Sequence, residues 1–288
     1  MSGTQVLDQA HVGEVARRSG SNFYYAFLFL PRRQRQAIHA LYAFCREVDD
    51  SVDAAPGAAE AALRVAAWRR ELDACYAGVP THPITRSLAS HLGAFPIRKA
   101  DLEEVIEGVS MDISPRSYET FEDLRLYCHR VASAVGLACI EIFGYTDPAA
   151  RRYAETLGLA FQMTNILRDV RQDAERRRIY LPAADRAACR CPDRDLAAGA
   201  PSPAFRALMR MEASRTRALF EEARSTLPRR DRRRLFAAEI MGAIYEAILD
   251  EIERRDYDVL RERIALPRLA RFGIAARLAL LRRVLPFA

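Results

Sequence analysis

The stretch GLAFQMTNILRDVRQDAERRRIYLP, residues 158–182, combines the apolar spacing of a buried helix with a line of polar side chains. At about 100° per residue, one stripe of this helix carries Gln162, Asn165, Asp169 and Asp173. Apolar residues make up most of the remaining circumference, which is typical of a helix in a protein interior. Because carboxylates in an apolar setting need a compensating partner, the polar stripe is expected to face something polar.

A second helical stretch, YAFCREVDDSVD at residues 42–53, repeats this spacing of acids. Its stripe carries Tyr42, Arg46, Asp49 and Asp53. For either helix alone, a solvated face on which arginines balance the acids explains the pattern equally well. Two helices with the same D-x-x-x-D spacing favour a different interpretation, in which both helices bind one ligand between them.

The chemistry that fits two such carboxylate pairs is Mg²⁺ binding. Mg²⁺ prefers oxygen ligands, keeps several waters and commonly bridges carboxylates to substrate phosphates. A general acid and base need only one carboxylate pair, so two pairs with an asparagine indicate a metal and diphosphate clamp instead. Arginines near the acids would complete the clamp through charge-assisted contacts with phosphate.

Two motifs give the chain a resemblance to a known family. Residues 127–136 read YCHRVASAVG, and residues 158–182 contain G-x3-Q-x2-N-I-x-R-D-V-x2-D-x4-R-x-Y-x-P. In these motifs the chain resembles the squalene and phytoene synthases, which join two prenyl diphosphates head to head. The resemblance runs from about residue 19 to residue 263. It implies an all-α isoprenoid synthase fold, a single helical bundle with the aspartates lining a central cavity.

The resemblance also implies roles for individual residues. The residues expected to hold Mg²⁺ are Asp49, Asp53, Asn165, Asp169 and Asp173. The four aspartates are expected to be catalytic together with Tyr127, whose ring would stabilise a developing allylic cation. The residues expected to bind substrate are Ser19, Gly20, Ser21, Asn22, Tyr42, Arg46, Gln162, Arg168, Arg178, Tyr245 and Arg263. Asp112 lies at a predicted helix end, where an ordinary helix-end acid is the favoured interpretation and a contribution near the cavity is the alternative.

The expected reaction joins two farnesyl diphosphates to presqualene diphosphate and releases one diphosphate. Residues 19–31 and 42–53 resemble most closely the bacterial presqualene diphosphate synthases of hopanoid biosynthesis. Arg46, Arg168 and Arg263 would offset the negative charge of the leaving diphosphate. NADPH is not expected, because no feature of the sequence identifies a nicotinamide site. The alternatives are a phytoene synthase, which uses two geranylgeranyl diphosphates, and a squalene or dehydrosqualene synthase.

Two other classes of protein share part of this pattern. The D-D-x-x-D at residues 49–53 also fits head-to-tail prenyl elongases and terpene cyclases, which the block at residues 127–136 disfavours. A non-catalytic assembly factor that resembles the family would be expected to lack an aspartate or the asparagine, and this chain has all of them.

Composition sets the broader limits. The 288 residues are half apolar and contain no linker or repeat, so we expect one domain over residues 1–288. The net charge of +6 comes mainly from arginine, but no nucleic-acid-binding motif accompanies it, so nucleic acid is not an expected partner. The sequence begins without an apolar leader, and its six cysteines lack disulfide or metal spacing, which together favour the cytoplasm.

Residues 266–288 form a basic amphipathic C-terminal end. On a helical wheel Arg268, Arg271, Arg282 and Arg283 share one face, and Arg277 points the other way. Such a segment can lie on an anionic membrane, which would place the protein at the inner face of the cell membrane. A terminal helix packed on the protein with exposed arginines is the alternative.

Overall fold

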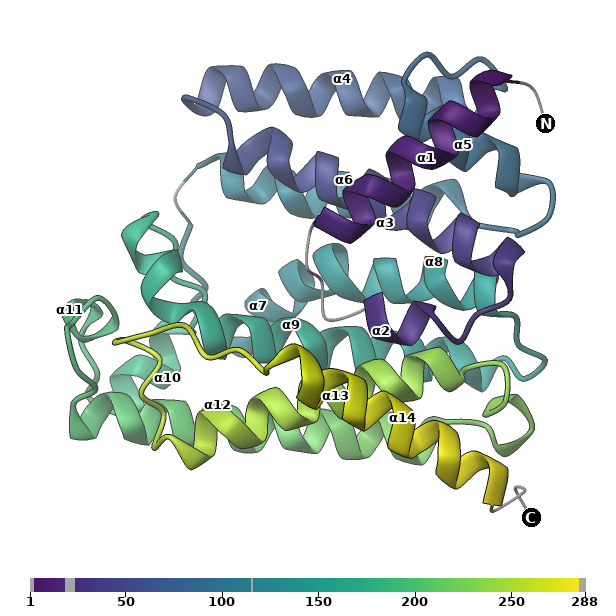
Figure 1. The fold of residues 1–288 in the computed structure, drawn as a ribbon. Helices are drawn as coiled ribbons and strands as arrows, with labels where there is room; N and C mark the ends of the chain where they lie inside the picture. The colour runs from purple at the N-terminus through teal and green to yellow at the C-terminus, as the bar shows by residue number, and fades with distance from the viewer. Residues whose placement is uncertain (1–2, 19–23, 115, 285–288) are drawn as a thin grey trace.

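The computed structural model describes residues 3–18, 24–114 and 116–284, and within these ranges it is a bundle of helices without a β-strand (Figure 1). The first seven α-helices are α1 (Gly3–Arg18), α2 (Tyr24–Phe27), α3 (Arg32–Asp53), α4 (Ala58–Tyr76), α5 (Pro83–Leu92), α6 (Lys99–Ser110) and α7 (Phe121–Cys128). The remaining seven are α8 (Ala134–Phe143), α9 (Ala149–Glu175), α10 (Ala183–Ala188), α11 (Asp193–Leu196), α12 (Pro203–Thr226), α13 (Phe236–Arg254) and α14 (Arg268–Val284). Short 3₁₀ turns, η1 (Met111–Ile113) and η3 (Arg229–Asp231), and a π-helical turn, η2 (His129–Ser133), complete the elements.

The helices form successive layers around α9. Helices α1, α4 and α5 cover α3, which packs with α6 against α8, and α8 in turn packs against α9 (Figure 1). Helices α12 and α13 cover the other side of α9, and α14 lies on the outside of α13. The two aspartate-bearing stretches of the sequence are thus the last turns of α3 and the second half of α9.

Close packing brings α9 and the 127–136 motif together. A Cβ atom on Gly158 would lie 2.7 Å from the Cα of Ser133, and one on Gly136 would lie 2.8 Å from the carbonyl oxygen of Ala154. Only glycine permits these backbones to approach so closely. The Ser133 hydroxyl also donates a hydrogen bond to the carbonyl oxygen of Glu155 at 2.7 Å. The small residues of the motif therefore serve helix packing.

The helical run formed by α7, η2 and α8, residues 121–143, is long and apolar enough to cross a membrane by length and composition. Half of its apolar window is buried, and the run packs between α6 and α9. These contacts are those of a core helix. Its first turn is stabilised by a capping box in which the Thr120 hydroxyl and the Asp123 carboxylate each accept from the other's backbone N–H.

Candidate active site

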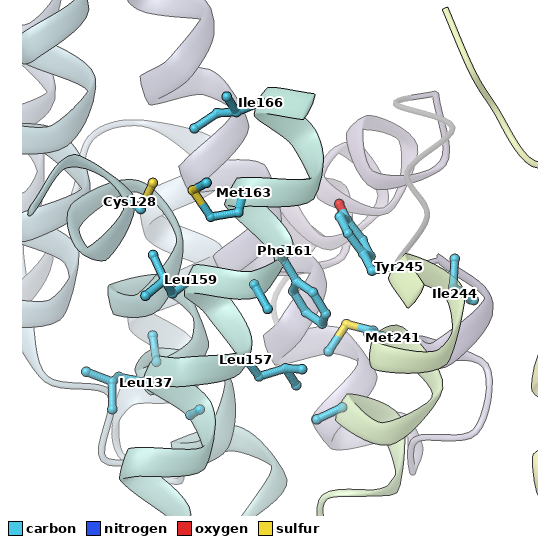
Figure 2. Close-up of a cluster of buried hydrophobic side chains, with 14 of the residues drawn as sticks. Cys128, Leu137, Leu157, Leu159, Phe161, Met163, Ile166, Met241, Ile244 and Tyr245 are labelled. Atoms are coloured by element: carbon cyan, nitrogen blue, oxygen red, sulfur yellow. The ribbon is translucent and has the colours of Figure 1, made fainter. Parts of the chain in front are cut away.

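A cavity of about 520 Å³ lies between α3, α8, α9 and α13. Its walls are mostly apolar, with side chains such as Ile38, Val109, Leu157, Phe161 and Met241. Figure 2 shows Phe161 of α9 beside Tyr245 of α13, and their ring centroids are 4.4 Å apart. A volume in this range is typical of a small-molecule site, and the apolar walls suit a hydrocarbon chain.

The cavity collects most of the residues predicted to bind substrate or metal. The predicted residues that line it are Tyr42, Arg46, Asp49, Tyr127, Gln162, Asn165, Arg168, Tyr245 and Arg263. The others within the described residues, Asp53, Asp169, Asp173 and Arg178, lie next to this polar end and contact or electrostatically influence its members. Ser19, Gly20, Ser21 and Asn22 lie outside the described residues.

On α3, Asp53 is held by arginines that follow α9 in the chain. Arg176 Nη1 and Arg178 Nη1 each donate to the Asp53 carboxylate at 2.7 Å. One turn earlier, Arg46 lies 3.5 Å from Asp49 and donates to Asp50 at 3.0 Å through Nε. Burial, together with the nearby charge of Asp53, raises the pKa of Asp49 to about 6. The end of α3 is therefore tied to the loop after α9.

On α9, Asp169 has two arginine partners from different elements. Arg168 Nε donates to Asp169 Oδ1 at 2.8 Å, and Arg263 Nε donates to the same oxygen at 2.7 Å. Burial acts to raise the pKa of Asp169, but the hydrogen bonds from these two arginines hold it below its usual value. Burial and the charge of Asp169 raise the pKa of Asp173, one turn later, to about 7. Within each D-x-x-x-D pair, one aspartate thus accepts hydrogen bonds from two arginines and the other has a raised pKa.

The side chains at this end of the cavity fit Mg²⁺. Asn165 Nδ2 donates to Gln162 Oε1 at 3.3 Å, which leaves Asn165 Oδ1 buried without a hydrogen-bond partner. An unsatisfied buried amide oxygen in a cavity that the Asp49 carboxylate also lines suits a hard cation that prefers oxygen ligands. Among the described residues, no three His, Cys, Asp or Glu side chains converge to form a metal cage by themselves. This arrangement suits an ion that completes its ligands with water and substrate phosphate.

A hydrogen-bonded cluster at the cavity wall contains Asp112, for which a position near the cavity was the less favoured of two interpretations. Tyr127 and Tyr180 donate their hydroxyl protons to the two carboxylate oxygens of Asp112, at 2.8 and 2.9 Å. The two tyrosine rings stack with centroids 4.9 Å apart. Burial, followed by the neighbouring Tyr180, raises the pKa of Tyr127 well above its usual value, so its phenol stays neutral. Asp112 is therefore not merely a helix-end acid: it orients a residue of the cavity wall.

The family motifs include one partner of Tyr127, which is Tyr180, but not the other, which is Asp112. Tyr180 belongs to the motif at residues 158–182, so its presence near the site follows from the same resemblance. Asp112 has no such marker, because its partners lie 15 and 68 residues away in the chain. The π-helical turn η2 follows Tyr127, and its residues Val131 and Ala132 also line the cavity. Such turns are frequent at functional sites.

Comparison with known proteins identifies the family. A family model described as squalene/phytoene synthase matches residues 16–270. The 15-cis-phytoene synthase of Synechococcus elongatus is 36% identical over 268 residues, covering 88% of this chain and 86% of the relative. The phytoene synthase of Arthrospira platensis is 35% identical over 270 residues, with 88% and 86% coverage.

Solved structures of similar proteins have the same fold. A dehydrosqualene synthase in complex with a ligand superposes with a TM-score of 0.84 at 25% identity, covering 98% of both chains. The squalene synthase HpnC from Alicyclobacillus acidocaldarius gives a TM-score of 0.80 at 30% identity, covering 90% of this chain and 97% of its own. These neighbours confirm the predicted all-α isoprenoid synthase fold around a central cavity. Through its matched residues, its fold and the identity of its relatives, the chain belongs to the squalene/phytoene synthase family.

Proposed function

We propose that this prenyltransferase condenses two identical prenyl diphosphates head to head in the cavity, forming a cyclopropyl diphosphate and releasing one diphosphate. The observation that carries the proposal is that two aspartate-bearing helices, α3 and α9, flank the polar end of a single apolar cavity. The polar end suits diphosphates, and the apolar walls suit prenyl chains.

The chain length of the substrate has two candidates. The relatives named above are phytoene synthases, which favours geranylgeranyl diphosphate. The motifs alone had favoured farnesyl diphosphate, with a phytoene synthase as the alternative. Farnesyl diphosphate, leading to presqualene diphosphate, is the second candidate. It is supported by the two solved structures, a dehydrosqualene synthase and a squalene synthase that is 30% identical.

In the proposed reaction, the C–O bond of the donor breaks and its electron pair leaves with diphosphate. Arg168 and Arg263, which contact Asp169, and Arg46 of α3 offset the negative charge that develops on the leaving group. Asp49, Asp53, Asn165, Asp169 and Asp173 are the residues that would hold Mg²⁺, which would supply further stabilisation of the negative charge on the diphosphate. The apolar walls exclude water from the allylic cation.

The double bond of the acceptor then attacks the cation, and loss of one proton closes the cyclopropane ring. Tyr127 lines the cavity, so its ring can stabilise the cation through its π face. Its hydroxyl already donates a hydrogen bond to Asp112, and its raised pKa keeps the phenol neutral. A neutral phenol is a poor base, so the proton is assigned to the released diphosphate.

One set of incubations tests the proposal. Purified protein is given farnesyl or geranylgeranyl diphosphate with Mg²⁺, with and without NADPH, and the products are identified by mass spectrometry. A C40 product from geranylgeranyl diphosphate supports the first candidate, and presqualene diphosphate from farnesyl diphosphate supports the second. We expect NADPH to change neither rate nor product. Squalene formed only with NADPH would reassign the protein as a squalene synthase, and chain elongation of either substrate would refute head-to-head condensation.

A further inference from the structure

The C-terminal helix α14 has an orientation that its sequence did not suggest. Its buried or partly buried side is formed by Ile274, Ala275 and Leu278, which pack against the core. Two members of the predicted basic face also turn towards the protein. Arg282 places its guanidinium 4.5 Å from the ring centroid of Phe236, and Arg271 lines the cavity. Two arginines of the predicted basic face therefore make contacts within the protein.

The opposite side of α14 is apolar and exposed. Leu269 is 85% exposed and Leu280 is 61% exposed, and Phe272 lies exposed between them. At about 100° per residue these three side chains, with Ala276, fall on one face of the helix, and Arg268 and Arg277 lie on its two flanks. A helix on the surface of a globular protein normally presents the reverse arrangement, with polar residues outward. We call this surface the outer apolar face.

Two further exposed apolar side chains follow α2. Leu28 and Phe29, just after this helix, are exposed, and α2 contacts α14. The Phe29 ring meets Phe236 edge to face, with centroids 6.0 Å apart, on the ring that Arg282 also contacts. Phe29 thus lies beside α13 and the side of α14 that faces the protein, and the outer apolar face is formed by α14 alone. Several exposed apolar side chains on one face of a helix mark a site of interaction with a partner or a membrane.

We propose that the outer apolar face docks this protein on an anionic lipid bilayer, with Leu269, Phe272 and Leu280 inserted at the interface. Helix α14 contains five arginines and no acidic residue, so its charge complements anionic lipid headgroups. An apolar face flanked by arginines is the pattern of helices that lie in the plane of a membrane surface. The charge distribution favours this occupant over a second copy of the chain, whose own α14 would bring like charges together.

The cavity lies beside the same segment. Leu266, just before α14, and Arg271 within it are both part of the cavity lining. Docking α14 on a bilayer would therefore bring the cavity wall close to the lipid, where an apolar product partitions. This last consequence rests on the proposed function, whereas the docking itself rests on the exposed side chains and the charge of α14.

The test measures vesicle binding without substrate, so it is independent of the proposed reaction. Full-length protein is sedimented with phosphatidylcholine vesicles and with vesicles containing phosphatidylglycerol. The variant that disrupts the outer apolar face is the double substitution Leu269→Glu with Leu280→Glu. The control pair is Leu63→Glu with Val79→Glu, which adds the same charge at exposed apolar positions in α4 and just after it, on the opposite side of the bundle from α14 (Figure 1).

We expect the natural protein to bind anionic vesicles, the Leu269 and Leu280 variant to bind at least about 10-fold more weakly, and the control variant to bind normally. Arg268→Gln with Arg277→Gln should weaken binding by about 10-fold and reduce its salt dependence. Turnover of dispersed substrate without vesicles should be unchanged in the Leu269 and Leu280 variant, because those side chains point away from the cavity.

Three outcomes would overturn the inference. Equal binding of the natural protein and the Leu269 and Leu280 variant would exclude the outer apolar face as the docking surface. Equal binding to neutral and anionic vesicles would exclude the charge contribution. A stable dimer in size-exclusion chromatography with light scattering that the same variant dissociates would identify the face as a subunit interface instead.

Discussion

Helices α3 and α9 carry the same D-x-x-x-D spacing, but the aspartate that two arginines bind is the second of the pair on α3 and the first on α9. On α3 the second aspartate, Asp53, is bound by two arginines, and the first, Asp49, has a pKa raised to about 6. On α9 the first aspartate, Asp169, is bound by two arginines, and the pKa of the second, Asp173, is raised to about 7. Identical spacing therefore leads to different electrostatic states.

The identical spacing therefore does not by itself determine the state of each carboxylate, because most of the arginines that bind the aspartates come from other elements. Asp53 owes its arginines to the loop after α9, and Asp169 owes one of its own to residue 263, after α13. The remaining aspartates are buried near like charges, which disfavours ionisation. A cation brought by the substrate would relieve this repulsion, so the arrangement is suited to assembly around a ligand.

The largest expected effect comes from removing one carboxylate from either helix. Asp49→Asn and Asp169→Asn should each lower kcat by about 100-fold or more, because each removes a carboxylate that would hold the Mg²⁺ expected to stabilise the leaving diphosphate. Circular dichroism should show an intact fold. Turnover is measured at limiting and saturating Mg²⁺. If one variant retains near-normal turnover at limiting Mg²⁺, the two helices do not share one ligand.

A smaller effect is expected at Asp112, which acts on the cavity through the two tyrosine hydroxyls. Asp112→Asn weakens two buried hydrogen bonds, and we expect kcat to fall roughly 10-fold with little change in KM. Tyr180→Phe is the matched variant, since it removes one of those bonds and leaves that of Tyr127. A change confined to thermal stability, with kcat intact in both variants, would show that Asp112 is only structural.

The two arginines on Asp53 allow a finer comparison, because both donate at 2.7 Å but differ in exposure. The Arg178 side chain is 16% exposed and the Arg176 side chain is 57% exposed. Since exposed ion pairs contribute little, Arg176→Gln should change kcat less than about 2-fold, whereas Arg178→Gln should lower it about 5-fold or more. Equal losses in steady-state kinetics would mean that exposure does not rank the two contacts.

Glu212 of α12 offers a buried carboxylate away from the cavity, and its variant should not affect turnover. Burial, with a hydrogen bond that the protonated carboxyl donates to the Asp185 carboxylate, raises the pKa of Glu212 from 4.5 to about 7, although Arg215 opposes the shift. The folded state therefore binds a proton more tightly than the unfolded chain. The resulting stabilisation is present below pH 4.5 and is lost as the pH rises through about 7.

The measurement is the free energy of urea unfolding between pH 5 and pH 8, at roughly one-unit intervals. The natural protein should lose on the order of 1 kcal/mol per pH unit across the lower part of this window relative to Glu212→Gln, which cannot titrate. Parallel curves for the two proteins would show that burial does not raise the pKa of Glu212. That result would also count against burial as the cause of the raised pKa values of Asp49 and Asp173.

Much of the fold and of the site composition was predictable from sequence. The helical class follows from apolar periodicity, and the placement of Asp49 and Asp169 on polar stripes follows from helix geometry within a few residues. The glycines and small residues of the 127–136 motif indicated close approach, and Gly158 and Gly136 lie where backbones nearly touch. The roles assigned to the site residues stay predictions until the variants are measured.

The family and the aspartate stripes were determined by the sequence itself, because motifs and helical periodicity are local properties of the chain. Tertiary structure alone decided that Arg178 binds Asp53 and Arg263 binds Asp169. It also decided that Asp112 orients Tyr127 and that α14 turns Leu269 and Leu280 outward. Each of these depends on contacts between segments far apart in the chain. A helical wheel gives the relative directions of side chains, but only the packing of neighbouring helices decides which direction faces the core.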